Sequence, residues 1–140
     1  MRRLLFFLTI GQLLFLAVSC RQAPTNQWIP GPDGVLNVYF FHMTDRCEAC
    51  NAIETNTRIV LEEHFKTLME KGAIKFYFFN IDKKENKAVT EKFKISYTSL
   101  LLVRADGKIT DFTNTSFNYA NMNPLKFKAL LKSEIDKNLE

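Results

Sequence analysis

The sequence VLNVYFFHMTDRCEAC, residues 35–50, decides the fold that this chain is expected to adopt. Its first seven residues are almost all apolar or aromatic, a pattern typical of a β-strand that is buried on both faces. A polar turn follows, in which Thr44 or Asp45 is expected to cap a helix. Cys47 and Cys50 then open a segment with helical periodicity. The stretch therefore predicts a strand, a turn and a helix that begins with a Cys-x-x-Cys pair.

The helical pattern covers residues 48–71 and ends at Gly72, a residue that often terminates helices. One stripe of this helix is expected to face the core, and it contains Ile53, Thr57, Val60, Leu61, His64, Phe65 and Leu68. Because successive residues turn by about 100° around a helix, Cys50 lies on the same stripe. We therefore expect Cys50 to be shielded and Cys47 to be exposed.

The rest of the chain predicts three more strands and two more helices. They are a strand over 73–81, a helix over 85–93 with Ala88, Val89 and Phe93 facing inward, a strand over 99–103, a strand over 109–112, and a helix after Pro124 with Phe127, Leu131, Ile135 and Leu139 facing inward. Residues 113–123, rich in Asn, Thr and Ser, are expected to form a loop. The order β-α-β-α-β-β-α predicts an α/β domain over 35–140, with a mixed four-stranded sheet and helices on both faces.

The position of the cysteine pair indicates thiol–disulfide chemistry, because a Cys-x-x-Cys next to a βαβ pattern is typical of a redox motif. At a helix N-terminus, free backbone N–H groups and the helix dipole stabilise a thiolate. Cys47 is therefore expected to be the nucleophile and Cys50 the thiol that resolves the mixed disulfide. Among the neighbours, the positive charge of Arg46 favours the thiolate, whereas the carboxylate of Glu48 disfavours it.

Residues 35–140 resemble a thioredoxin-superfamily domain that lacks the extra N-terminal strand and helix, and the resemblance implies a three-layer α/β/α sandwich. Three positions depart from the family pattern. Arg46 replaces the usual Trp. Phe41 aligns with the buried acid that is a proton shuttle in the family, so that role is vacant or is filled by Asp45, Glu48 or water. Thr98 takes the place of the usual cis-Pro. In the family that Pro lines the substrate groove and keeps metals away from the thiols, so the resemblance implies that Tyr97 and Thr98 form the groove loop here. A cis peptide before a non-proline residue costs about 3 kcal/mol, so a trans bond is expected there.

The first twenty residues have the features of an export signal. Two arginines precede an apolar run over 4–18, which is short for a bilayer span. Residues 16–20 (LAVSC) resemble a bacterial lipobox, which implies a signal peptide over 1–19, lipidation of Cys20 and a Pro-rich tether over 20–34. The expected location is the periplasmic face of the inner or outer membrane, held by acyl chains. An ordinary cleaved signal peptide or an uncleaved anchor is the alternative.

Composition and cysteine count limit the remaining function classes. The chain has 140 residues, 46% of them apolar, and 19 Lys+Arg against 15 Asp+Glu. Without Arg2 and Arg3 the basic count falls from 19 to 17, so the net charge is +2, too small and too interspersed to predict nucleic-acid binding. A zinc site is not expected, because His64 lies 14 residues along the helix from Cys50, about 21 Å away.

The sequence thus predicts a membrane-tethered thiol–disulfide oxidoreductase that needs no cofactor beyond its own disulfide. Its expected partners are protein or small-molecule disulfides and a membrane-side electron donor or acceptor. Two alternatives stay open. One is a copper-binding chaperone whose soft ligands are Cys47, Cys50, His42 and Met43. The other is a thioredoxin-like binding module that does not turn over a substrate.

Overall fold

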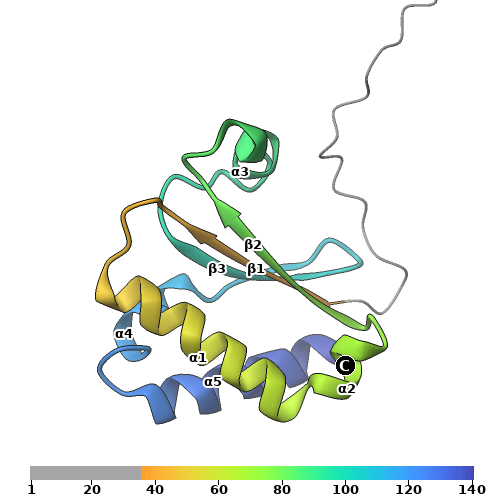
Figure 1. Cartoon of the computed structure of the whole chain (residues 1–140). Coiled ribbons are helices and arrows are strands. Elements are labelled where there is room, and N and C mark those ends of the chain that lie inside the picture. Colours follow the sequence, from red (N-terminus) through yellow and green to blue (C-terminus); the bar gives the residue numbers. More distant parts are fainter. Residues whose placement is uncertain (1–35) are drawn as a thin grey trace, which may run out of the picture.

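A computed structural model describes residues 36–140, which form one four-stranded sheet with helices on both faces (Figure 1). The elements are β1 (Leu36–His42), α1 (Glu48–His64), α2 (Lys66–Glu70), β2 (Ile74–Asn80), the 3₁₀ turn η1 (Lys84–Asn86), α3 (Lys87–Phe93), β3 (Ser99–Arg104), β4 (Ile109–Asp111), α4 (Thr113–Tyr119) and α5 (Pro124–Leu139). The strand order is β2-β1-β3-β4, with β1 parallel to β2 and antiparallel to β3. The predicted mixed four-stranded sheet and α/β class are confirmed.

The central strand β1 is buried along its whole length, as its sequence predicted. Because side chains alternate across a strand, Val38 and Phe40 face the layer of α1 and α5, whereas Tyr39 and Phe41 face α3. The first layer has a core that includes Ile53, Leu61, Phe127, Leu131 and Ile135, each at most 1% exposed. The second layer is built around stacked aromatic rings of β1 and β2 and the ring of Phe93.

The long helix predicted over 48–71 is broken into α1 and α2, so this prediction was wrong. Phe65 leaves the helical conformation with φ −126° and ψ 10°, and its ring is buried at 4% exposure. The break turns Phe65 into the core, while His64 is exposed instead of facing inward. Gly72 ends the segment as expected, because its φ of +72° lies in the left-handed region that favours glycine.

The second difference is α4, which forms where a loop was expected. Ser116 anchors it, since both its backbone N–H (2.9 Å) and its hydroxyl (2.7 Å) donate to the carbonyl of Phe112. The hydroxyl oxygen of Thr113 accepts the backbone N–H of Leu100 at 3.1 Å and ties the helix to β3. A third, smaller correction concerns Ala88, which is exposed although it was expected to face inward.

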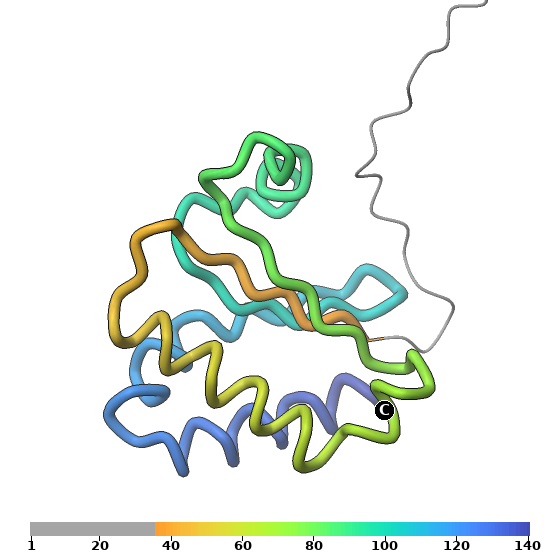
Figure 2. Tube along the Cα trace, viewed as in Figure 1, coloured from red at the N-terminus to blue at the C-terminus, as the bar shows by residue number. Residues whose placement is uncertain are grey.

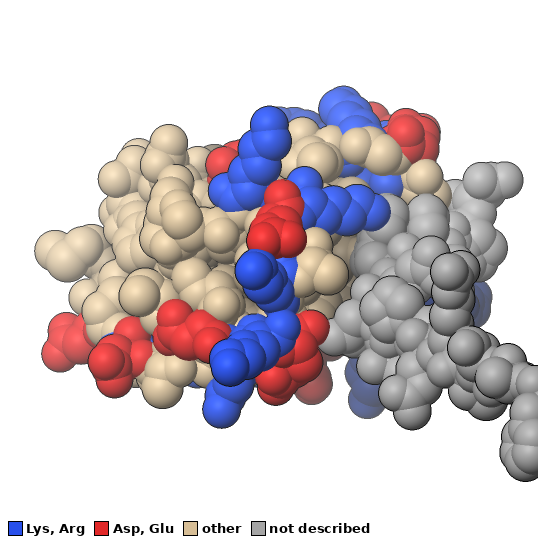
Figure 3. Space-filling view, turned by 90° about the horizontal axis from the view of Figure 1, so that it is seen from above, with Lys and Arg blue, Asp and Glu red and all other residues tan. Residues whose placement is uncertain are grey.

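The path of the chain brings several connections to one end of the molecule (Figure 2). The turn after β1, the start of β3 and the segment of α4 all lie there. Seen from above, Lys and Arg lie beside Asp and Glu across the middle of the surface, whereas the end at the left is largely uncharged apart from acidic groups along its lower edge (Figure 3).

The expected signal peptide (1–19), the lipidation site Cys20 and the tether (20–34) lie outside the described residues. Within residues 36–140, none of the helices combines the length and the apolar character that a membrane crossing requires.

Candidate redox site

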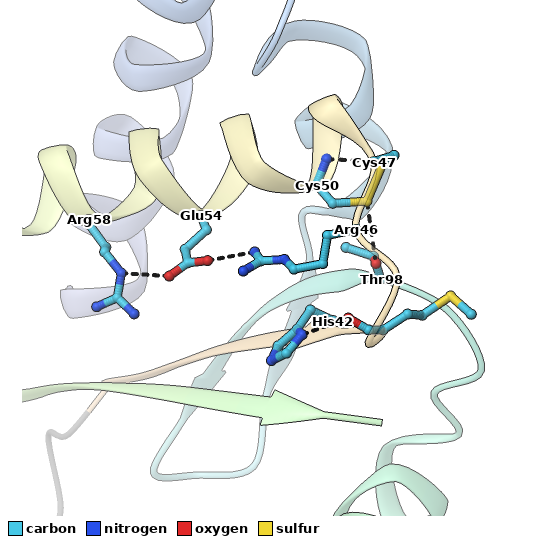
Figure 4. Close-up of polar contacts among 8 residues, drawn as sticks. His42, Arg46, Cys47, Cys50, Glu54, Arg58 and Thr98 are labelled. Carbon is cyan, nitrogen blue, oxygen red and sulfur yellow. Dashed lines mark hydrogen bonds and ion pairs between the residues drawn. A yellow bond between two sulfur atoms is a disulfide. The ribbon is translucent and has the colours of Figure 1, made fainter. Parts of the chain in front are cut away.

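The two cysteines form a disulfide where the turn after β1 meets α1 (Figure 4). Their Cα atoms are 5.1 Å apart. Cys47 is exposed and Cys50, one turn into the helix, is only 6% exposed. The exposures expected from the helical stripe are therefore found, with one sulfur-bearing residue facing solvent and the other packed beneath it.

Cys47 itself is the N-cap of α1, because its Sγ accepts the backbone N–H of Cys50 at 3.2 Å. The prediction that Thr44 or Asp45 caps the helix was wrong. Thr44 contacts Asp82 instead: its backbone N–H donates to the Asp82 carboxylate at 2.7 Å. This contact lowers the pKa of Asp82 and fastens the turn to the end of β2.

The guanidinium of Arg46 points away from the disulfide, beneath α1 (Figure 4). It forms an ion pair with Glu54 at 2.5 Å and lies over the rings of Phe40 (5.7 Å) and Phe78 (5.5 Å). Arg58 contacts the same carboxylate at 2.9 Å. Burial of Glu54 acts to raise its pKa, but the two guanidinium groups outweigh that effect and lower the pKa below its usual value. The charge of Arg46 is thus balanced by a carboxylate rather than directed at Cys47.

Thr98, the residue just before β3, supplies a polar side chain that contacts the disulfide. Its hydroxyl donates to Cys50 Sγ at 3.7 Å, and the residue is 4% exposed. The bond before Thr98 is trans, as expected, since no cis peptide bond occurs in residues 36–140. Tyr97, the other expected groove residue, is 54% exposed at the same loop.

Phe41, which aligns with the family's buried acid, lies on the face of β1 opposite to the layer of α1. It faces α3, whereas the neighbouring Phe40 faces the layer of α1. The reason is strand alternation, which places neighbouring residues on opposite faces. Asp45 and Glu48, the two carboxylates expected as substitutes, are both exposed.

His42 and Met43, the additional ligands of the copper hypothesis, have other surroundings. The ring of His42 lies 4.3 Å from that of Phe78, and its Nδ1–H donates to the Met43 carbonyl at 2.9 Å. Met43 is 40% exposed. In the part of the chain that the structure describes, no group of three or more His, Cys, Asp or Glu side chains is arranged to hold a metal ion.

Sequence reasoning missed Glu54, Arg58 and Asp82. The i,i+4 spacing of Glu54 and Arg58 on one helix predicts their ion pair, so that signal was present. The contacts of Arg46 with Glu54 and of Thr44 with Asp82 join a turn to other elements, and no spacing in the sequence predicts them.

No protein-family model and no curated protein sequence matches this chain. Among solved structures it resembles the thioredoxin of Fasciola hepatica, with a TM-score of 0.51 and 16% identity over 76% of this chain and 83% of that one. Thioredoxin f2 of Chlamydomonas reinhardtii is 24% identical over 75% and 83% of the two chains, with a TM-score of 0.43. A structure described as a malarial protein has a TM-score of 0.41 and 16% identity over 63% and 98%.

At such low identity the first of these similarities shows the fold and not the activity. The chain therefore has an α/β thioredoxin-like fold. Its Cys47–Cys50 disulfide stands at the start of the first helix of that fold.

Proposed function

We propose that this protein is an exported, membrane-tethered thiol–disulfide oxidoreductase that acts on protein or small-molecule disulfides. The observation that carries the proposal is the Cys47–Cys50 disulfide, with an exposed residue at the helix N-cap and a buried one a turn later. This asymmetry gives the two sulfurs different tasks, because only the exposed one is open to an incoming thiolate or disulfide.

In the reducing direction, the Cys47 thiolate attacks a substrate disulfide and forms a mixed disulfide, while one substrate sulfur leaves with the electron pair. Cys50 then attacks Cys47 Sγ, releases the second substrate thiolate and closes the Cys47–Cys50 bond. The reverse sequence oxidises a substrate dithiol. A membrane-side electron donor would sustain the first direction, and a membrane-side electron acceptor the second.

The first experiment is an equilibration of the full-length chain carrying Cys20→Ser, in mild detergent, against glutathione and dithiothreitol redox buffers. This variant leaves only two thiols to titrate. We expect a reversible two-electron couple between about −270 and −120 mV, the range spanned by known oxidoreductases. A bond far harder to reduce than this would overturn the proposal and favour a structural disulfide.

Export and tethering rest on residues 1–20 and are tested separately. The wild-type chain, expressed in a Gram-negative host with a labelled fatty acid, should incorporate the label and sediment with membranes. Cys20→Ser should lose the label, because the acyl chains need the thiol of Cys20. Equal labelling of both forms would exclude Cys20 as the lipidation site, and no labelling of either would exclude the lipoprotein hypothesis.

A further inference from the structure

The chemistry of the proposed function creates a negative charge at a buried atom. When a substrate thiolate attacks Cys47 Sγ, the S–S bond breaks and its electron pair remains on Cys50 Sγ. Cys50 is 6% exposed, so little water reaches the thiolate that forms. A buried charge is costly unless it is hydrogen-bonded or paired. The structure should therefore hold a group that stabilises this sulfur.

The ionisable neighbours do not take this role. Arg46 is paired with Glu54 and directed beneath the helix, away from the disulfide (Figure 4). Asp45 and Glu48 are exposed carboxylates, which carry the wrong charge for stabilising a thiolate. The backbone N–H of Cys50 itself donates to the other sulfur, that of Cys47.

Thr98 is well placed for the task. Among residues 36–140, its Oγ1 is the one side-chain oxygen or nitrogen that hydrogen-bonds Cys50 Sγ, at 3.7 Å. The contact joins residues 48 positions apart and is buried on both sides. The backbone on either side of Thr98 is joined by a hydrogen bond, which the hydroxyl of Ser99 donates to the Tyr97 carbonyl at 2.9 Å. Thr98 directly precedes Ser99, which pairs with Phe41 of β1, so its hydroxyl is presented to the sulfur beside a strand end that the sheet holds in place.

We propose that Thr98 is a positioning residue whose hydroxyl donates a hydrogen bond to the Cys50 thiolate as it leaves or attacks. The proposal rests on the redox function above and deepens it. A hydroxyl is suited to both states of the sulfur, because it donates to a thiolate and accepts from a thiol. A proline side chain at this position would offer neither, so the departure from the family pattern supplies a polar group where the family has none.

The test compares full-length chains that all carry Cys20→Ser in the same detergent. Thr98→Val removes the hydroxyl and keeps the shape, whereas Thr98→Ser keeps the hydroxyl. The matched control is Thr57→Val, which makes the same change at a residue that is 0% exposed and whose hydroxyl has no hydrogen-bond partner in residues 36–140. Each oxidised protein is mixed with excess reduced glutathione at pH 7, and free thiols are followed by alkylation and mass spectrometry.

We expect Thr98→Val to slow reduction by about tenfold, since hydrogen bonds to charged groups are the strong ones. Thr98→Ser should react within about twofold of the wild type, and Thr57→Val should be unchanged. Equal slowing by valine and serine would overturn the inference, because the loss would then come from packing. An unchanged rate for Thr98→Val would overturn it directly.

Two further measurements separate the possible failures. The urea midpoint of each oxidised variant shows whether it is folded, and Thr98→Ala replaces Thr98→Val if the valine disturbs packing. If the Thr98 variants do not react as expected, but the Cys20→Ser chain that keeps Thr98 shows a reversible redox couple, only the inference about Thr98 is wrong. Should that chain show no reversible couple, the proposed function is wrong.

Discussion

Replacing Arg46 by methionine should destabilise the fold while leaving disulfide exchange almost unchanged. The Arg46 side chain is 23% exposed and its partner Glu54 is 18% exposed, so the pair lies between a surface ion pair and a buried one. Surface pairs contribute about 0–1 kcal/mol, and removing one partner of a buried pair costs about 3–5 kcal/mol. An intermediate cost of about 1–2 kcal/mol follows for this site.

The aromatic contacts add to that cost. The guanidinium lies over the rings of Phe40 and Phe78, and cation–π contacts at partly exposed sites contribute about 0.5–1 kcal/mol each. Methionine retains part of the packing, so we expect a total loss of about 2–3 kcal/mol. For a domain of this size, that loss corresponds to a urea midpoint lower by about 1–2 M.

The assay is urea unfolding of the oxidised full-length protein, followed by circular dichroism. Arg58→Met is the matched control, because Arg58 shares Glu54 as its partner and also lies over Phe78, yet it is 50% exposed. Arg58 also lies over Phe76, so it has as many ring contacts as Arg46, and the difference comes from its more exposed ion pair. Its loss should therefore be about 1 kcal/mol smaller than that of Arg46→Met. Equal losses for the two variants would refute the reasoning from burial. A tenfold slower reaction of Arg46→Met with glutathione would show that the charge of Arg46 acts on the thiolate after all.

Three more predictions concern α1. Glu54→Gln should remove a stabilisation that depends on pH. The pKa of Glu54 is lower in the folded state than in the unfolded chain, where it is about 4.3. The carboxylate therefore adds to the free energy of unfolding above that pH, and this contribution is lost as the pH falls toward the folded-state pKa. Urea midpoints of wild type and variant should therefore converge from pH 7 to pH 3, and a constant gap would contradict this. Thr57→Val should raise the free energy of unfolding by about 1 kcal/mol, because it removes a buried hydroxyl without a partner; a lower urea midpoint would argue against it. With oxidised glutathione, Cys50→Ser should form a stable adduct at Cys47. We expect this reaction, followed by mass spectrometry, to be at least about tenfold faster than adduct formation at Cys50 in Cys47→Ser, because Cys50 is buried. Equal rates would contradict the assignment of Cys47 as the nucleophile.

Much of the fold could be predicted, because the spacing of apolar residues along a segment shows which face of a helix or strand is buried. The run from Leu36 to Phe41 contains few polar residues, and the strand it predicts is buried on both faces. The helix α4 could not be predicted in this way. Its residues, Thr-Asn-Thr-Ser-Phe-Asn-Tyr, have weak helix propensity, and contacts with Phe112 and Leu100 hold it in place.

The candidate site was predictable only where its parts are local. The exposures of Cys47 and Cys50 follow from the turn of one helix. His64 was misplaced: it is the last residue of α1, and its side chain is exposed although the helical stripe puts it inward. The partners of Arg46 and Thr98 depend on how β1, α1 and β3 pack together, and that information is spread over the whole chain.

The position of β1 in the sheet has a consequence for synthesis. This strand emerges first of the four, yet both of its neighbours, β2 and β3, come later in the chain. Its apolar and aromatic side chains are therefore without their sheet partners until most of the domain has left the ribosome. Unpaired strand edges and exposed apolar surface make a nascent chain prone to aggregate. The strand at the centre of the sheet is thus also the segment that waits longest for its sheet partners.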